Sequence, residues 1–235
     1  MSAILKCIGL ERKVSEDYTL GQIDLIISLG ETVALIGPNG AGKTTFFELV
    51  TGNSDPTSGE VHFKGERFRP EFYEIKRKMG YLSQDINLPL WVTPKELLKY
   101  SASLHKIEDA EERISEQINL WQIESYQNNP IASCSHGMKK RAGLAAALLH
   151  DPDFLILDEP FAGLDIIHIK SLKSTIIERA KSNKTTIVST HILPYASELC
   201  SKAFTIKDGE INEIKDWATM EFAAQQKTIE KHFTI

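Results

Sequence analysis

The segment from Gly37 to Thr45, Gly-Pro-Asn-Gly-Ala-Gly-Lys-Thr-Thr, constrains this chain more than any other. It fits the pattern G-x-x-x-x-G-K-[ST], and the apolar run 32–36 comes directly before it. A glycine-rich turn between a strand and a helix lets successive backbone N–H groups converge on one anion. We therefore expect a strand at 32–36, a helix opening at 45–50 and a phosphate-binding loop between them. A glycine-rich turn that binds no ligand is the alternative.

Each position of this loop has an expected role. Lys43 would reach the β- and γ-phosphates of a nucleotide, and the hydroxyl of Thr44 would ligate Mg²⁺. The other residues would surround the phosphates with their backbone, and they are Gly37, Pro38, Asn39, Gly40, Ala41, Gly42 and Thr45. The loop alone leaves open which nucleotide is bound and what its hydrolysis drives.

The composition is that of an ordinary globular protein. Its 235 residues are 42% hydrophobic and 25% charged, enough for one large α/β unit, and the net charge of −5 gives no reason to expect nucleic-acid binding. Three cysteines, far apart and without metal-ligand spacing, indicate reduced thiols in a cytosolic setting: Cys7, Cys134 and Cys200. We expect no signal peptide, and no apolar run approaches the roughly 18 residues of a membrane span. Any membrane-spanning part would therefore belong to another chain.

Strand and helix patterns predict a nucleotide-binding core interrupted by a helical insert. Residues 1–30 and 57–63 alternate short apolar runs with turns, which predicts antiparallel strands. The runs 154–157 and 185–190 are short, continuous and apolar, as in parallel strands buried on both faces. The expected limits are about 1–85 and 148–215 for the core, 86–147 for the insert and 216–235 for a C-terminal tail. The tail is mildly amphipathic, and we assign it no role.

Within the insert, a charged stretch begins at residue 94 and runs to about 120. Thr93 suits the N-cap of a helix and Pro94 its first position.

Two acids follow the 154–157 run. Asp158 and Glu159 stand at the carboxyl end of a buried strand, the edge where ligands bind in open α/β sheets. An aspartate there can hold the Mg²⁺ shell, and a neighbouring glutamate can polarise a water for in-line attack on the γ-phosphorus. The alternative is a pair of surface acids in the turn before Pro160. The phosphate loop upstream favours the catalytic interpretation.

A third motif, Ser-Cys-Ser-His-Gly-Met-Lys-Lys-Arg, spans 133–141 ahead of an alanine- and leucine-rich helix. Ser135 is expected to cap this helix, whose free N–H groups could bind an anion. Taken alone, the motif favours a well-capped helix without a ligand. The basic residues 139–141, taken alone, indicate a solvated face.

The order of these motifs resembles the ATP-binding subunits of ABC transporters over essentially the whole chain. In that family a phosphate loop precedes a glutamine, a helical subdomain, a Leu-Ser-Gly-Gly-Gln signature, an Asp-Glu strand end, a Gly-Leu-Asp loop and a histidine. The corresponding positions here are Gln84, the signature at 134–138, Asp158, Glu159, the loop 163–165 and His191. The resemblance implies an α/β fold: a P-loop NTPase core with a mainly parallel sheet, an antiparallel β subdomain and an inserted α-helical subdomain.

The resemblance also implies a function and partners. The chain would bind ATP and Mg²⁺ and hydrolyse ATP to drive translocation by separate membrane-spanning subunits. Two such subunits would pack head to tail, each ATP lying between one phosphate loop and the partner's Ser135 and Gly137. The permease would dock on the helical insert, which would hold the chain at the cytoplasmic face of a membrane.

Four further residues acquire roles through the resemblance. Glu159 would be the general base, and His191 would contact the γ-phosphate and orient the attacking water. Gln84 would touch Mg²⁺ or that water, and Asp165 would lie at the dimer interface.

The chain departs from the family pattern in two places. Only Ser135 and Gly137 match the signature, because its other positions hold Cys134, His136 and Met138. We expect nucleotide binding to be retained, whereas the hydrolysis rate stays open. The family's adenine-stacking aromatic, about 23 positions before the loop, is replaced by a valine, Val14, which cannot stack. Tyr18 either contacts the base in its place or packs elsewhere.

Two other functions compete with a transport subunit. One is a soluble ABC-type ATPase with a non-transport role, which the single ATPase unit and the acidic charge disfavour. The other is a low-turnover, ATP-binding regulatory subunit, suggested by the altered signature. Glu159 and His191 argue against it, because a retired site has little need of either residue.

Overall fold

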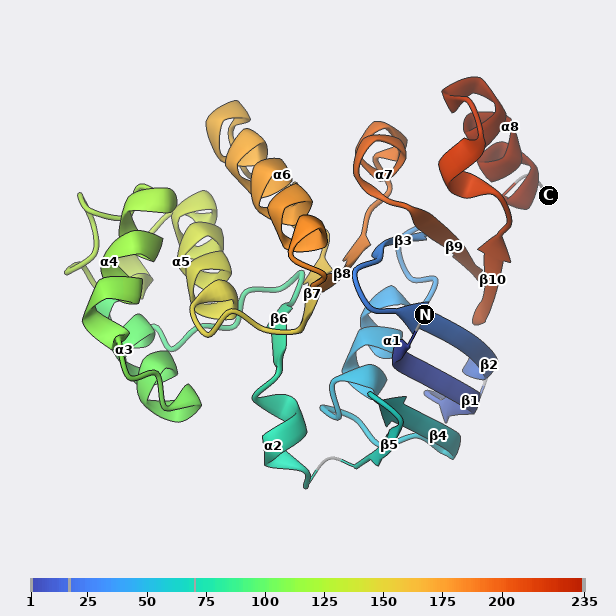
Figure 1. Cartoon of the computed structure of the whole chain (residues 1–235), viewed down its shortest axis with the longest axis horizontal. Helices are drawn as coiled ribbons and strands as arrows, with labels where there is room; N and C mark the ends of the chain where they lie inside the picture. The colour runs from blue at the N-terminus through green and yellow to red at the C-terminus, as the bar shows by residue number, and fades with distance from the viewer. Residues whose placement is uncertain (1, 17, 70, 234–235) are drawn as a thin grey trace.

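The chain folds around two β-sheets and a set of surrounding helices, seen in a computed structural model that describes residues 2–16, 18–69 and 71–233 (Figure 1). The strands are β1 (Ala3–Lys13), β2 (Thr19–Ser28), β3 (Thr32–Ile36), β4 (Ser58–Phe63), β5 (Glu66–Phe68), β6 (Met79–Leu82), β7 (Phe154–Asp158), β8 (Thr185–Ser189), β9 (Lys202–Lys207) and β10 (Glu210–Ile214). The helices are α1 (Lys43–Val50), α2 (Tyr73–Lys76), α3 (Pro94–His105), α4 (Ala110–Leu120), α5 (His136–Leu148), α6 (Ile166–Lys181), α7 (Leu193–Leu199) and α8 (Phe222–Phe233).

The larger sheet has the strand order β10-β9-β3-β8-β7-β6. All its neighbouring strands run parallel except the hairpin of β9 and β10. Every residue of β3, β7 and β8 is buried, which explains why their sequences are continuous apolar runs. This arrangement confirms the expected α/β class with a mainly parallel sheet.

The smaller sheet is antiparallel, with the order β2-β1-β4-β5. Leu5 of β1 lies between Ile27 of β2 and Phe63 of β4, so apolar residues share one face. These side chains pack with Phe46 and Phe47 of α1 in a common core. The antiparallel strands expected in 1–30 and 57–63 are therefore confirmed.

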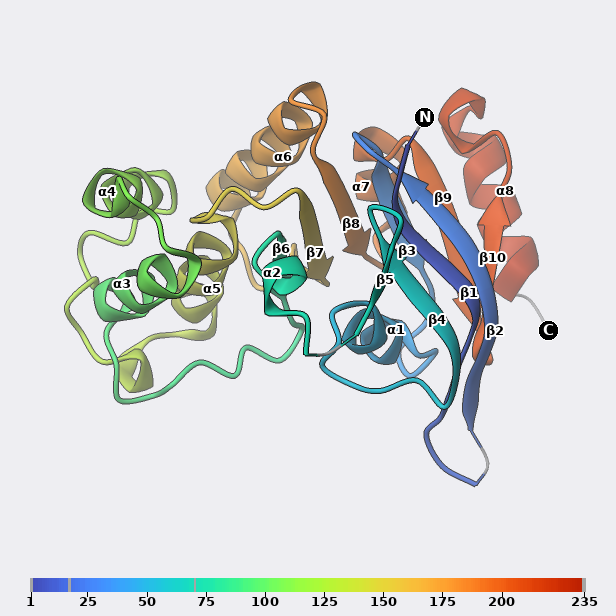
Figure 2. The same cartoon turned by 60° about the horizontal axis from the view of Figure 1, so that its bottom comes forward.

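Helices α3, α4 and α5 group at one end of the molecule, and the antiparallel sheet lies at the other (Figures 1 and 2). The predicted start of α3 is confirmed, because Thr93 Oγ1 accepts from the Glu96 N–H at 3.2 Å and Glu96 Oε2 accepts from the Thr93 N–H at 2.8 Å. The helices pack around the fully buried Trp121. The limits given above for the insert stay a prediction.

The C-terminal tail covers the outer side of the sheet beside β9. Trp217, in a short 3₁₀ turn (Trp217–Thr219), is buried against Ala34, Ala203 and Ile214. Gln225 of α8 donates from Nε2 to the Trp217 carbonyl at 2.9 Å. The tail thus closes a third hydrophobic cluster, a role that the sequence pattern did not reveal.

The chain has three cysteines, Cys7, Cys134 and Cys200. All three are free and buried, and burial raises the pKa of each thiol, to about 12 for Cys200. No helix within residues 2–16, 18–69 and 71–233 is both long and apolar enough to cross a bilayer.

Candidate nucleotide-binding site

The phosphate loop connects β3 to α1, as the sequence predicts. Gly42 adopts φ 103°, a left-handed conformation that favours glycine, directly before the first helical residue. For this reason α1 begins at Lys43, two residues earlier than expected. Space also dictates the glycine at 37, where a Cβ would lie 2.5 Å from the Ile206 carbonyl oxygen. The loop therefore presents Lys43 and Thr44 in the first turn of a helix.

Lys43 points back into the loop. Its Nζ donates to the carbonyls of Gly37 at 2.8 Å and Pro38 at 3.0 Å, and it lies 3.6 Å from Glu159 Oε1. The side chain is buried. An ammonium inside the curve of the loop, at the carboxyl edge of β3, is placed to meet a bound phosphate.

Thr44 and Asp158 bring two oxygen ligands together. Thr44 Oγ1 donates to Asp158 Oδ2 at 2.6 Å, and Ser189 Oγ donates to Asp158 Oδ1 at 2.5 Å. Asp158 is fully buried, so it is not the surface acid of the alternative interpretation. Hydroxyl and carboxylate oxygens are the ligands that Mg²⁺ prefers, and the ion keeps its other positions for water and substrate phosphates. This pair fits the expected cation.

Glu159 is held in an unusual conformation beside the phosphate loop. It is 5% exposed and has φ 46°, and its N–H donates to Ser189 Oγ at 2.8 Å. One carboxylate oxygen, Oε2, lies 3.0 Å from His191 Nδ1, and the other, Oε1, faces Lys43. The surface-acid interpretation is wrong for Glu159 as well, and His191 is brought to the site from the end of β8.

A cavity of about 420 Å³ opens on the loop. It is lined by Val14, Tyr18, Asn39, Gly40, Gly42, Lys43, Thr44, Thr45 and Gln84. Tyr18 belongs to this group, and its hydroxyl donates to the Ala41 carbonyl at 2.8 Å. A larger cavity, of about 610 Å³, lies beside α6 and contains none of the residues expected in the site.

Ser135 and Gly137 are not among the residues that line the phosphate-loop cavity of their own chain. Ser135 is the N-cap of α5, as predicted, and its Oγ accepts from the Met138 N–H at 3.3 Å. A Cβ on Gly137 would lie 2.9 Å from the Gly163 carbonyl oxygen, so glycine lets α5 approach the loop after Glu159. Ser135 itself is exposed.

Asp165 caps α6 and is linked through His168 of α6 to Arg141 of α5. It accepts from the His168 N–H at 3.0 Å and lies 2.7 Å from His168 Nδ1, and these bonds lower the pKa of the carboxyl. His168 is buried, with Arg141 Nη1 3.1 Å from its Nε2. Since a guanidinium only donates, His168 Nε2 accepts from Arg141, and Nδ1 donates to Asp165.

Sequence reasoning missed three residues of the site and misjudged its basic cluster. Ser189, His168 and Lys140 all hold residues of the site in place. The solvated face expected at 139–141 is wrong for Lys140, which is 1% exposed, and for Arg141, which donates to the carbonyls of Trp121 and Gln122. A helical count would have found Lys140, because it shares a face with Leu144 and Leu148.

Comparison with known proteins finds a matching family profile and similar individual proteins. The family profile described as "ABC transporter" matches residues 20–162. The chain is 34% identical over 209 residues to a Bacillus subtilis (strain 168) protein named "Uncharacterized ABC transporter ATP-binding protein YdbJ", covering 88% of this chain and 68% of that protein. It is 33% identical to the bacitracin transport ATP-binding protein BcrA of Bacillus licheniformis, covering 91% of this chain and 70% of that protein.

The chain also matches a solved structure. A structure described as an ATP binding subunit of an ABC transporter superposes with a TM-score of 0.83 at 27% identity, covering 91% of each chain.

Proposed function

The chain belongs to the ABC transporter family of ATP-binding proteins, the ATP-hydrolysing subunits that energise transport, and from this premise we propose how its residues divide the work. The observation that carries the proposal is the position of Glu159. Its buried carboxylate lies between the Lys43 ammonium and the His191 imidazole, at the carboxyl end of β7.

The triphosphate of ATP binds in the loop 37–45. The backbone N–H groups of the loop and the first turn of α1 surround the phosphates, and Lys43 contacts the β- and γ-phosphates. Thr44 and Asp158 would hold Mg²⁺, and Gln84 lines the same cavity as Thr44. When bound, the cation would neutralise charge on the phosphates.

Glu159 acts as the general base. It takes a proton from the attacking water as the water oxygen bonds to the γ-phosphorus and the bond to the β-phosphate oxygen of ADP breaks. His191 contacts the γ-phosphate and orients the water, and its hydrogen-bonded position beside Oε2 supports this role.

Ser135 and Gly137 serve the ATP of a second subunit. They stand outside the cavity of their own chain, at the N-terminus of a helix whose N–H groups favour an anion. A head-to-tail dimer brings them to the partner's γ-phosphate and creates a C2-symmetric interface between identical chains. Asp165 lies at that interface, where the exposed Ile166 and Ile167 of α6 supply apolar area.

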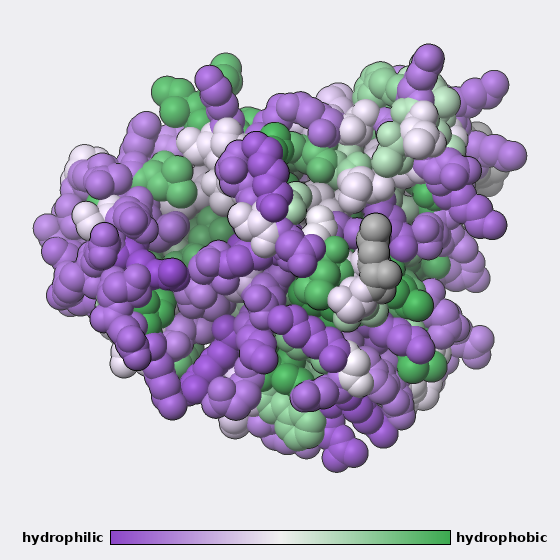
Figure 3. All heavy atoms as spheres, viewed as in Figure 1, coloured by the Kyte–Doolittle hydropathy of each residue, from purple (hydrophilic) through white to green (hydrophobic). Residues whose placement is uncertain are grey.

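The permease docks on the segment that precedes and includes α3. Large apolar side chains are exposed there, and Trp91 is 83% exposed, with Leu90, Tyr100 and Leu104 also open to solvent. Elsewhere on the face in Figure 3, hydrophilic residues predominate and hydrophobic ones form small separate patches. Exposed aromatic anchors are typical of protein interfaces. The chain then works at the cytoplasmic face of a membrane.

The two competing functions are less well supported. A non-transport ATPase does not need the exposed aromatic side chains on the helical side. A regulatory subunit with little turnover does not need the Glu159–His191 contact at 3.0 Å.

Replacing Glu159 by glutamine tests the proposal. Glu159→Gln keeps the shape of the side chain but cannot take up a proton at neutral pH, so we expect ATP binding to persist and turnover to fall about 10²–10⁴-fold. The unhydrolysed ATP should hold the closed dimer together. Size-exclusion chromatography with Mg²⁺ and ATP should show a dimer that disappears when ATP is omitted.

Glu178→Gln is the matched control, because Glu178 is an exposed acid on α6 outside the site. It should hydrolyse ATP at the wild-type rate and form no stable dimer. A Glu159→Gln protein that turns over as fast as the wild type would remove Glu159 from the role of base.

A further inference from the structure

Lys140 is a buried cation that the mechanism described above does not use. It lies on α5, it is 1% exposed, and its Nζ donates to the carbonyls of Glu159 at 2.6 Å and Ala162 at 2.8 Å. None of the ion pairs found within the described part of the chain includes it. Burial lowers the pKa of Lys140, and the negative charges of Glu159 and Asp158 offset part of that effect. A lysine buried against two carbonyls is costly, which suggests a specific task.

The carbonyl that Lys140 holds belongs to a strained residue. Glu159 has φ 46°, a left-handed conformation that is strained for a non-glycine residue and persists only where its surroundings hold it. Ser189 Oγ accepts from the N–H of Glu159, and Lys140 donates to its carbonyl. The backbone of Glu159 is therefore fixed on both sides, by β8 through Ser189 and by α5 through Lys140.

The same helix also meets the rest of the loop after β7. Lys140 Nζ bonds the carbonyl of Ala162, and the next residue, Gly163, packs against the first turn of α5. A Cβ on Gly163 would lie 2.9 Å from His136 Cδ2. The loop 159–163 and the start of α5 are thus joined by polar and van der Waals contacts.

We propose that Lys140 is a positioning residue for the hydrolysis step, whose ammonium holds the backbone of Glu159 so that the carboxylate stays between Lys43 and His191. The inference rests on the proposed role of Glu159 as the base. Because Ser135 caps α5, Lys140 also ties the helix that would meet the partner's ATP to the base of its own subunit. A displacement of about 1 Å at a reacting group costs on the order of 10² in rate.

Lys140→Met tests the inference, because methionine fills a similar volume without donating a hydrogen bond. We expect turnover at saturating ATP to fall about 10–100-fold, while the ATP dissociation constant stays within about twofold of wild type. Lys140→Gln keeps an amide donor on a shorter side chain, so its turnover should lie between those of the wild type and Lys140→Met. Single-turnover hydrolysis of labelled ATP and a binding titration measure the two quantities separately.

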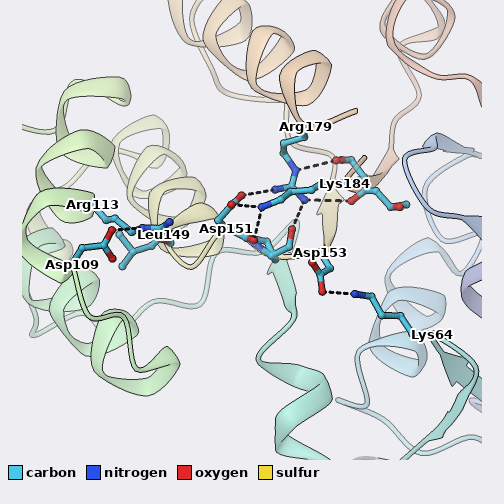
Figure 4. Close-up of polar contacts among 11 residues, drawn as sticks. Lys64, Asp109, Arg113, Leu149, Asp151, Asp153, Arg179 and Lys184 are labelled. Atoms are coloured by element: carbon cyan, nitrogen blue, oxygen red, sulfur yellow. Dashed lines mark hydrogen bonds and ion pairs between the residues drawn. The ribbon is translucent and has the colours of Figure 1, made fainter. Parts of the chain in front are cut away.

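Arg179→Met is the matched control for loss of a buried cation. Arg179 lies at the other end of the same strands, where its Nη2 donates to the carbonyls of Pro152 at 2.8 Å and Thr185 at 3.4 Å. Figure 4 shows it beside Asp151 and Lys184. Its removal should lower the melting temperature but leave turnover per folded molecule unchanged. Lys140→Met should lower both.

A double variant shows whether Lys140 affects turnover by positioning Glu159 or independently of Glu159. If Lys140 acts through Glu159, then Lys140→Met in the Glu159→Gln background should slow residual turnover no further. An equal slowing in both backgrounds would overturn the inference, as would a Lys140→Met protein with wild-type turnover beside a slow Glu159→Gln. Wild-type turnover in Glu159→Gln would instead refute the proposed base. If Lys140→Met does not fold, Lys140→Gln decides by the same comparisons.

Discussion

Tyr18 lies beside the phosphate loop, four residues after Val14 in the sequence. Its hydroxyl donates to the Ala41 carbonyl inside the loop. The same hydroxyl oxygen lies so close to Gly42 that a Cβ there would be 2.3 Å away. Val14 lines the same cavity but is half exposed and cannot stack. Tyr18 directly precedes β2, which begins at Thr19, and the start of this strand places the tyrosine ring beside the phosphate loop.

We predict that Tyr18→Ala weakens ATP binding roughly two- to tenfold, the effect of losing one stacked ring. Tyr18→Phe keeps the ring and loses only the hydroxyl bond to Ala41, so it should bind nearly as tightly as the wild type. Titration with ATP and with inorganic triphosphate measures this. The triphosphate, which has no base, should bind all three proteins alike. Equal weakening by both substitutions would assign the effect to the hydroxyl instead.

Single residues of the site differ in how far the sequence predicts them. Lys43, Thr44, Asp158 and Glu159 are predictable because each has a fixed spacing from a strand end. Ser189 is not, because its two hydrogen bonds to residues 158 and 159 depend on the pairing of β7 with β8, in which Asp158 lies opposite Ser189, 31 positions further along the chain.

At the scale of elements, two stacked histidines join the end of α3 to the turn that follows α5. The His105 and His150 rings lie 3.6 Å apart at 13°, and His150 Nε2 donates to the Met79 carbonyl at 3.0 Å. Nδ1 of each ring is buried and has no hydrogen-bond partner within the part of the chain that the structure describes. Burial lowers the pKa of both rings, and for His150 burial and the neighbouring His105 ring together lower it to about 4. The contact therefore requires neutral rings.

This contact makes stability depend on pH. A histidine in the unfolded chain has a pKa near 6.5, so between pH 6.5 and 4 the unfolded chain binds more protons than the folded one. The stabilisation is complete above about pH 6.5 and is lost as the pH falls toward 4. We predict that His150→Gln, which keeps a donor for Met79, reduces the drop in melting temperature between pH 7.5 and 5. His232→Gln, outside this contact, should not. An unchanged drop in His150→Gln would contradict the assignment.

Elements also differ in how well the sequence predicts them. β3, β7 and β8 are buried on both faces, so their apolar runs are visible without knowing their neighbours. β6 has only four residues, one of them Gly80, and gives no such signal. The tail packs onto β9 through Trp217. The sequence of the tail alone predicts only a mildly amphipathic helix and does not indicate which strand it contacts.

At the scale of the whole molecule, the residues of the site fall into two groups. Lys43, Asp158, Glu159 and His191 surround one loop, whereas Ser135 caps a helix outside that cavity. In the proposed head-to-tail dimer, each chain would carry two half-sites, and a complete site would require one from each of two chains. This division predicts that two different defective chains can restore one complete site when they are mixed.

We predict that Lys43→Ala and Ser135→Arg proteins, each nearly inactive alone, recover ATPase activity when mixed. In a mixed dimer, the phosphate loop of the Ser135→Arg chain meets the intact Ser135 of the Lys43→Ala chain. With free exchange about half of the dimers are mixed and each has one working site, so about a quarter of wild-type activity should return. Lys43→Ala mixed with Glu159→Gln is the control, because both changes damage the same half-site and no combination is complete. No recovery in the first mixture, although differently sized tags prove that mixed dimers form, would mean that each chain hydrolyses ATP within its own residues.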